Sequence, residues 1–301
     1  MTTPPRKHAS DFDPEVLKLF DRYVHGIIDR RAFLSGAAKF AVGATTAAGL
    51  LAALSPQFAL AQQIKPDDAR LSAKYVEFPS PQGYGTARGY LVRPAKVGAP
   101  LPVVLVVHEN RGLNPHIEDV TRRLALKNFI AFAPDALFPL GGYPGDEDAA
   151  RAEFAKLDQT KTRQDFLAAT DMLLKLEGGN GRLGAIGFCY GGGIVNFLAT
   201  QRPQVLAAAP FYGSAPELAD VPKIKAELQV VLAANDERIN AGWPAYEAAL
   251  KQAGVHYSLY QPAGTEHGFH NDTTPRYDET AAREAWRRSL TLFERVLRKK
   301  V

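Results

Sequence analysis

One cysteine, one aspartate and one histidine stand where side chains could carry out nucleophilic catalysis. Cys189 is the single cysteine of the 301-residue chain, and residues 187–191 around it read GFCYG, which has the G-x-nucleophile-x-G form. Asp236 follows 47 residues later, and His267 comes another 31 residues after it. This order of nucleophile, acid and histidine is typical of a catalytic triad that acts on acyl groups.

The glycines beside Cys189 have a physical reason. A nucleophile in such a motif occupies a tight strand-to-helix turn, and side chains at Gly187 and Gly191 would collide with the neighbouring strand and helix. The turn also directs backbone N–H groups of the new helix at the reaction centre, which favours a thiolate and then an oxyanion. A buried structural cysteine is the alternative, but it would need neither glycine.

A carboxylate, Glu109, follows the apolar run 102–107. In this architecture the loop after that strand supplies the second oxyanion N–H, so we expect Glu109 near Cys189 and the backbone N–H groups of Asn110 and Tyr190 around the oxyanion. A solvated loop glutamate is the alternative, and spacing alone does not decide between them. The histidine spacings do not match H-E-x-x-H, so we predict neither a metal site nor a cofactor.

The elements that must position these residues alternate between two patterns. Short apolar runs predict strands, and apolar residues three or four positions apart predict helices between them. This alternation predicts one α/β domain over residues 62–301, with a mostly parallel sheet, helices on both faces and reacting groups on loops after the strands. The predicted strands are 74–78 and 86–92 as a hairpin, then 102–107, 129–133, 183–188, 205–210, 228–233 and 257–260; the predicted helices include 117–126, 166–176 and 282–297.

Composition narrows the function classes. Apolar residues make up 46% of the chain and charged residues 23%, which is ordinary for a globular protein. The net charge is +4 and no basic run is present, so the sequence predicts no nucleic-acid partner. A single cysteine excludes an internal disulfide and any multi-cysteine metal cluster.

The first 61 residues have the pattern of an export leader. Arg30 and Arg31 precede Phe33 and a run without charges over 40–54, and residues 59–61 read ALA. A charged region, a short apolar region and an A-x-A site describe a signal peptide, and the arginine pair resembles the twin-arginine type. We therefore expect residues 1–61 to lie outside the fold, with cleavage after Ala61, a periplasmic location and membrane contact only during export. A retained anchor or a buried helix is the alternative; the run falls short of the ~20 residues that span a bilayer.

Together these motifs resemble the dienelactone hydrolase family over residues 74–295. The resemblance rests on the Glu109 loop followed by GLNPHI at 112–117, the cysteine motif, FYG at 211–213, and the Asp236 and His267 loops. It implies an α/β-hydrolase fold, a triad of Cys189, His267 and Asp236, and a loop glutamate that contacts the cysteine and helps to deprotonate it. Members of this family hydrolyse dienelactone, an enol lactone, to maleylacetate.

One departure concerns the substrate. Family members that act on dienelactone hold its carboxylate with two arginines, and the matching stretches here, 135–140 and 267–271, contain none. Arg111, Arg238 and Tyr143 are candidates for substrate binding instead. The sequence thus predicts a hydrolase of small esters or lactones that acts through a thioester; a general carboxylesterase of the same fold, or a non-catalytic exported protein with a redox-sensing thiol, is the alternative.

Overall fold

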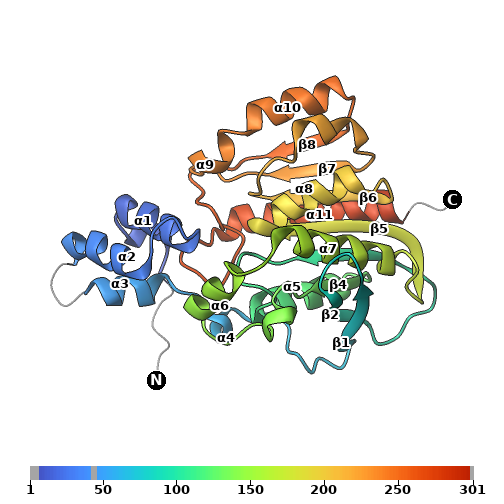
Figure 1. The fold of residues 1–301 in the computed structure, drawn as a ribbon, viewed down its shortest axis with the longest axis horizontal. Coiled ribbons are helices and arrows are strands. Elements are labelled where there is room, and N and C mark those ends of the chain that lie inside the picture. Colours follow the sequence, from blue (N-terminus) through green and yellow to red (C-terminus); the bar gives the residue numbers. More distant parts are fainter. Residues whose placement is uncertain (1–6, 42–45, 299–301) are drawn as a thin grey trace.

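An eight-stranded sheet forms the centre of the computed structural model, which describes residues 7–41 and 46–298 (Figure 1). The strand order is β1-β2-β4-β3-β5-β6-β7-β8. β1 and β2 form an antiparallel hairpin, β2 lies antiparallel to β4, and the remaining neighbours run parallel. The strands are β1 Leu71–Ser80, β2 Gly85–Pro94, β3 Leu101–Val107, β4 Ile130–Pro134, β5 Gly179–Phe188, β6 Val205–Phe211, β7 Glu227–Val231 and β8 Tyr257–Tyr260.

Helices cover both faces of the sheet, as the alternating pattern predicts. One face packs against α7, α8 and α10, and the other packs against α5 and α11. Central strands such as β3 are apolar along their whole length because both of their faces are buried. The helices of this part are α5 Pro115–Ala125, α6 Glu147–Phe154, α7 Gln159–Leu173, α8 Tyr190–Gln201, α9 Glu237–Asn240, α10 Trp243–Gln252 and α11 Glu279–Leu297, with 3-10 turns at Phe138–Leu140 and Leu218–Lys223. The predicted mostly parallel α/β domain is confirmed.

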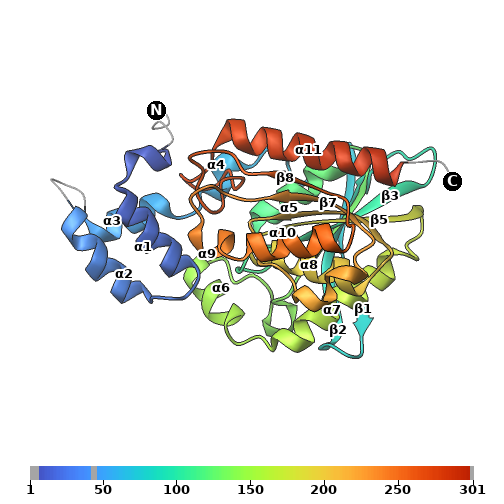
Figure 2. The ribbon, with the colours of Figure 1, turned by 90° about the horizontal axis from the view of Figure 1, so that it is seen from above.

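The N-terminal segment is folded, which differs from the expectation that it lies outside the fold. It forms α1 Pro14–Val24, α2 Arg30–Ala37, α3 Ala47–Leu54 and α4 Phe58–Ala61, with 3-10 turns at Ala9–Asp11 and Ala38–Phe40. Figures 1 and 2 both place α1, α2 and α3 together at one end of the molecule, beside α6 and α9. We call the described residues 7–41 and 46–61 the N-terminal cap.

The cap folds because its helices bury their apolar faces against one another. Phe20, Phe33, Leu51 and Leu54 form the centre of a separate small core, and Phe33 and Leu54 have no exposed surface. The same apolar residues that suggested an export leader therefore have partners within the cap. Residues 42–45 of the predicted apolar run lie outside the described residues. Across the part of the chain that the structure describes, no helix has both the length and the apolar character to cross a membrane.

Candidate active site

Cys189 lies in a strained turn between β5 and α8. Its backbone φ is +56°, a value rare for residues other than glycine, and this turns the side chain out at the carboxyl edge of the sheet. A Cβ at Gly187 would overlap the carbonyl oxygen of Gly191, and a Cβ at Gly191 would overlap that of Val107. The collisions expected with the helix and the neighbouring strand are therefore confirmed, and the turn requires both glycines.

His267 and Asp236 come from the loops that follow β8 and β7. His267 Nδ1 lies 2.5 Å from Asp236 Oδ2, and both side chains are buried. Asp236 also accepts a hydrogen bond from the backbone N–H of Ile239 at the start of α9, which holds the carboxylate in place. His267 Nε2 has no hydrogen-bond partner within the described residues. This ring is oriented as a base whose free nitrogen is available for a reacting atom.

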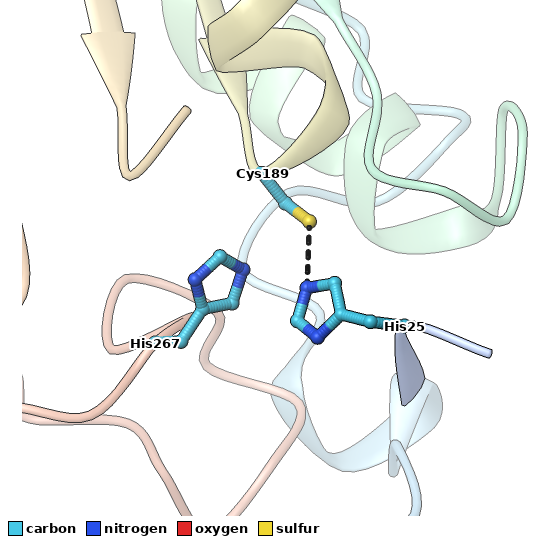
Figure 3. A group of neighbouring side chains, drawn as sticks. All are labelled: His25, Cys189 and His267. Carbon is cyan, nitrogen blue, oxygen red and sulfur yellow. Dashed lines mark hydrogen bonds between the residues drawn. The ribbon is translucent and has the colours of Figure 1, made fainter. Parts of the chain in front are cut away.

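A third residue, His25 of the N-terminal cap, reaches the same sulfur (Figure 3). Its Nε2 lies 3.5 Å from Cys189 Sγ. The rings of His25 and His267 meet edge to face, with centroids 4.6 Å apart, and the ligand atoms of His25, Cys189 and His267 all lie within 4.8 Å of one another. His25 is not among the predicted site residues, because no motif around it marks it as reactive.

These neighbours change the ionisation of the thiol. Burial raises the pKa of Cys189, but the adjacent His267 and His25 together have a larger effect in the opposite direction and lower the pKa to about 5. Burial likewise lowers the pKa of His267, while the Cys189 thiolate and the Asp236 carboxylate raise it to about 10. The site therefore favours a thiolate beside an imidazolium at neutral pH, which is the reactive form of a catalytic cysteine.

Glu109 lines the same cavity as Cys189, but its hydrogen-bond partner is Asn271: Glu109 Oε2 accepts a hydrogen bond of 2.8 Å from Asn271 Nδ2. No hydrogen bond joins it to Cys189 among the residues described.

Two residues are predicted to supply oxyanion N–H groups. Tyr190 is the first residue of α8, so the helix itself leaves its N–H unpaired. Asn110 lies in the loop after β3, and its side chain donates to the carbonyl of Val24 in the cap.

Comparison with known proteins agrees with this geometry. The family model described as Dienelactone hydrolase family matches residues 87–297, which is most of the chain. A protein of Synechocystis named as a carboxymethylenebutenolidase is 33% identical over 232 residues, and the match covers 70% of this chain and 92% of that protein. The chain belongs to the dienelactone hydrolase family. It is therefore a hydrolase, similar to carboxymethylenebutenolidases, as the sequence predicts.

Other similarities extend this result. A hydrolase fragment of Escherichia coli K12 named YghX is 51% identical over 115 residues, covering 38% of this chain and 98% of that protein. The crystal structure of a dienelactone hydrolase from Klebsiella pneumoniae superposes with a TM-score of 0.65 at 26% identity, covering 74% of this chain and 98% of that one. A second family model, described as YqhI-like, matches residues 3–41, a range that overlaps the cap.

A cavity of about 300 Å³ lies between the cap and the hydrolase domain and contains Cys189 and His267. Two of the predicted substrate-binding residues, Arg111 and Tyr143, line it. Tyr143 donates to Glu147, and the Nε of buried Arg111 lies 3.6 Å from the same carboxylate. Arg238 is placed differently, because its guanidinium donates to Nε2 of His25 at 3.0 Å.

Two further arginines, neither of them predicted to bind substrate, also line this cavity. Arg276 follows the histidine loop, and its Nε and Nη1 have no hydrogen-bond partner in the described part of the chain, although Nη1 lies 3.6 Å from Asp21. Arg30, from the predicted twin-arginine pair, forms an ion pair with Asp148. The cavity is lined by both arginines and carboxylates, and Arg111 and Arg276 keep buried nitrogens that make no hydrogen bond to a described residue.

The grouping of His25, Cys189 and His267 also resembles a metal-ligand set, since thiolate and imidazole bind zinc. One feature opposes this interpretation. The Arg238 guanidinium already donates to Nε2 of His25, so a metal ion bound there would have to displace it.

Proposed function

We propose that this hydrolase cleaves a small ester or lactone of the enol-lactone kind by transferring the acyl group to Cys189. One observation carries the proposal: the sulfur of Cys189 lies in a positive-φ turn beside His267, whose other nitrogen is held 2.5 Å from Asp236. This is the arrangement of a nucleophile, a base and an orienting acid.

The reaction has two halves. The Cys189 thiolate attacks the carbonyl carbon, and the backbone N–H groups of Tyr190 and Asn110 stabilise the oxyanion by about 3 kcal/mol for each donor. The C–O bond then breaks, which leaves a thioester, and the leaving oxygen departs as an enolate or takes up the proton that the thiol lost and departs as an alcohol. His267 removes a proton from a water molecule that hydrolyses the thioester. Enol lactones and aryl esters have better leaving groups than alkyl esters, so we expect them to react faster.

The substrate we expect carries a carboxylate. Arg111 and Arg276 line the cavity that holds the nucleophile, and each has a buried nitrogen with no hydrogen bond to any described residue. A carboxylate would satisfy those donors, and charged hydrogen bonds of this kind are stronger than neutral ones. The small cavity favours a compact substrate over a long-chain ester.

Turnover of matched substrates tests this function. We expect wild type to hydrolyse an anionic enol lactone faster than an aryl ester, and an aryl ester faster than an alkyl ester. Cys189→Ala and His267→Ala should both lose turnover, and mass spectrometry of quenched wild-type enzyme should detect an acyl group on Cys189. Undiminished turnover in both variants would refute the triad. Export by the twin-arginine machinery remains a prediction, which cell fractionation would check.

A further inference from the structure

The N-terminal cap is attached to the loop that is expected to form the oxyanion hole. The carbonyl oxygen of Val24 accepts one hydrogen bond from Asn110 Nδ2 at 2.9 Å and another from Arg111 at 3.1 Å. At the other end of the cap, the backbone N–H of Gln57 donates to the carbonyl of Thr273. These bonds place His25, the residue after Val24, directly beside the catalytic sulfur.

The protonation of the His25 ring follows from its partners. Its Nδ1 lies 2.8 Å from the backbone carbonyl oxygen of Asp21, which only accepts, so Nδ1 carries the hydrogen. The Arg238 guanidinium only donates, so Nε2 presents its lone pair. That lone pair also faces Cys189 Sγ, so Nε2 is the atom that can take the thiol proton when Cys189 ionises.

His25 also has a carboxylate of its own. Asp21 Oδ1 lies 3.3 Å from His25 Nδ1 and 3.6 Å from Arg276. Burial lowers the pKa of His25, but the Cys189 thiolate and Asp21 outweigh this effect and raise the pKa overall. Two imidazole rings, one from the cap and one from the hydrolase domain, lie beside a single sulfur (Figure 3). Each ring has a carboxylate near its Nδ1, Asp21 for His25 and Asp236 for His267.

Glu109, by contrast, is engaged with Asn271 and has no hydrogen bond to Cys189 among the described residues. The position that the family resemblance assigns to a deprotonating glutamate is therefore served here by an imidazole nitrogen 3.5 Å from the sulfur.

We propose that the N-terminal cap stays on the working enzyme and that His25 is a catalytic residue, the base that accepts the thiol proton of Cys189. The proposal rests on the hydrolytic function proposed above. The S–H bond breaks, its electron pair stays on sulfur, and the proton forms an N–H bond at Nε2. Arg238 is exposed and releases Nε2 as the proton arrives.

Under this proposal, His25 and His267 act as bases in different steps of the reaction. The His25 imidazolium returns its proton to the oxygen of the leaving group when the thioester forms, so the acylation step is neutral overall. His267 acts in the second step: once the thioester has formed, the thiolate charge that raises the pKa of His267 is gone, so the ring can release its proton and accept one from water. Loss of His25 should therefore slow acylation alone, whereas loss of His267 should also slow hydrolysis of the thioester.

The test compares His25→Gln with His8→Gln in the full chain, because His8 is an exposed cap histidine. Rapid-mixing kinetics with an activated aryl ester should show acylation slowed by about 100-fold or more in His25→Gln, the range for loss of a general base, with the thioester hydrolysis rate unchanged. The thiol of His25→Gln should titrate closer to the ~8.5 of a free cysteine. His8→Gln should match wild type in all three measurements.

A second variant separates loss of the base from a general folding defect. Asp21→Asn removes the carboxylate beside His25 but keeps the imidazole, so we expect a smaller loss of the acylation rate and a partial shift of the thiol titration. Circular dichroism would establish that each variant is folded. Wild-type acylation and thiol titration in folded His25→Gln would overturn the proposal.

Retention of the cap is measured directly. The intact mass of the enzyme from the cells that make it should correspond to a chain that still contains His25, whereas a chain that begins at Gln62 would overturn the proposal. Failure of the hydrolytic function is distinguishable: a wild-type enzyme that hydrolyses no ester removes that function, while the thiol titration of His25→Gln still reports on the role of His25.

Discussion

The titration of the Cys189 thiol is the sharpest consequence of this site. Burial raises the pKa of this thiol, but His267 and His25 outweigh burial and lower the pKa to about 5. Arg111 and the phenol of Tyr212 also interact electrostatically with the sulfur. A lowered thiol pKa means that the thiolate exists above about pH 5 and is lost as the pH falls through that value. At pH 7 the thiolate fraction is about 99%, compared with about 3% for a free thiol of pKa ~8.5.

The rate at which Cys189 reacts at neutral pH does not, however, distinguish a thiol of lowered pKa from a free thiol. A thiolate loses nucleophilicity as its pKa falls, with a Brønsted slope of about 0.45, so a pKa lower by about 3.5 makes each thiolate about 40-fold slower toward a disulfide. That loss cancels the roughly 30-fold larger thiolate fraction at pH 7. At pH 6 the thiolate fraction is about 300-fold larger, and Cys189 should react about 7-fold faster than a free cysteine.

The assay is stopped-flow reaction with an aromatic disulfide across pH 4–10, with the released thiol followed by absorbance. Because Cys189 is the single cysteine, the signal has one source. We expect an inflection near pH 5 in wild type and a higher one in His267→Gln. A single inflection between pH 8 and 9 in the folded wild-type enzyme would refute the electrostatic account of the site.

Three further predictions concern the turn, the cavity and the cap. Gly191→Ala should lower the free energy of unfolding by about 3 kcal/mol, because its Cβ overlaps backbone atoms of β3, while Gly98→Ala, in open space, should leave the denaturant midpoint unchanged. Arg111→Gln should raise KM for an anionic lactone about 10- to 100-fold through loss of a charged hydrogen bond, and equal effects on a neutral aryl ester would argue against carboxylate binding. Leu54→Ala should destabilise the cap by about 2–5 kcal/mol and expose it to limited proteolysis, whereas exposed Leu60→Ala should not; equal digestion of the two would contradict a packed cap core.

Much of the hydrolase domain could be predicted because its signals are local. Strands buried on both faces need continuous apolar runs, and the strand-turn-helix at Cys189 needs its two glycines, so both leave short patterns in the sequence. The side chains that follow the carboxyl ends of parallel strands share one edge of the sheet. Asp236 and His267 could therefore be paired without coordinates, and the structure holds them 2.5 Å apart.

The composition of the cap is consistent with two different structures. A run of Ala, Gly and Leu after an arginine pair is typical of an export leader, but small apolar residues also suit short helices that pack closely together. Periodicity within the segment does not say what its apolar faces contact. Only the packing of Phe33 and Leu54 into a core of their own distinguishes a folded cap from an unpartnered leader.

The sequence alone thus predicts the cysteine turn, the pairing of His267 with Asp236, and the sheet that carries them. Which groups surround the sulfur depends on tertiary packing. His25 lies 164 residues from Cys189 in the chain, and Glu109 is engaged by Asn271, 162 residues away. Contacts across such separations depend on how whole elements dock against each other, and a short sequence pattern carries no record of that docking.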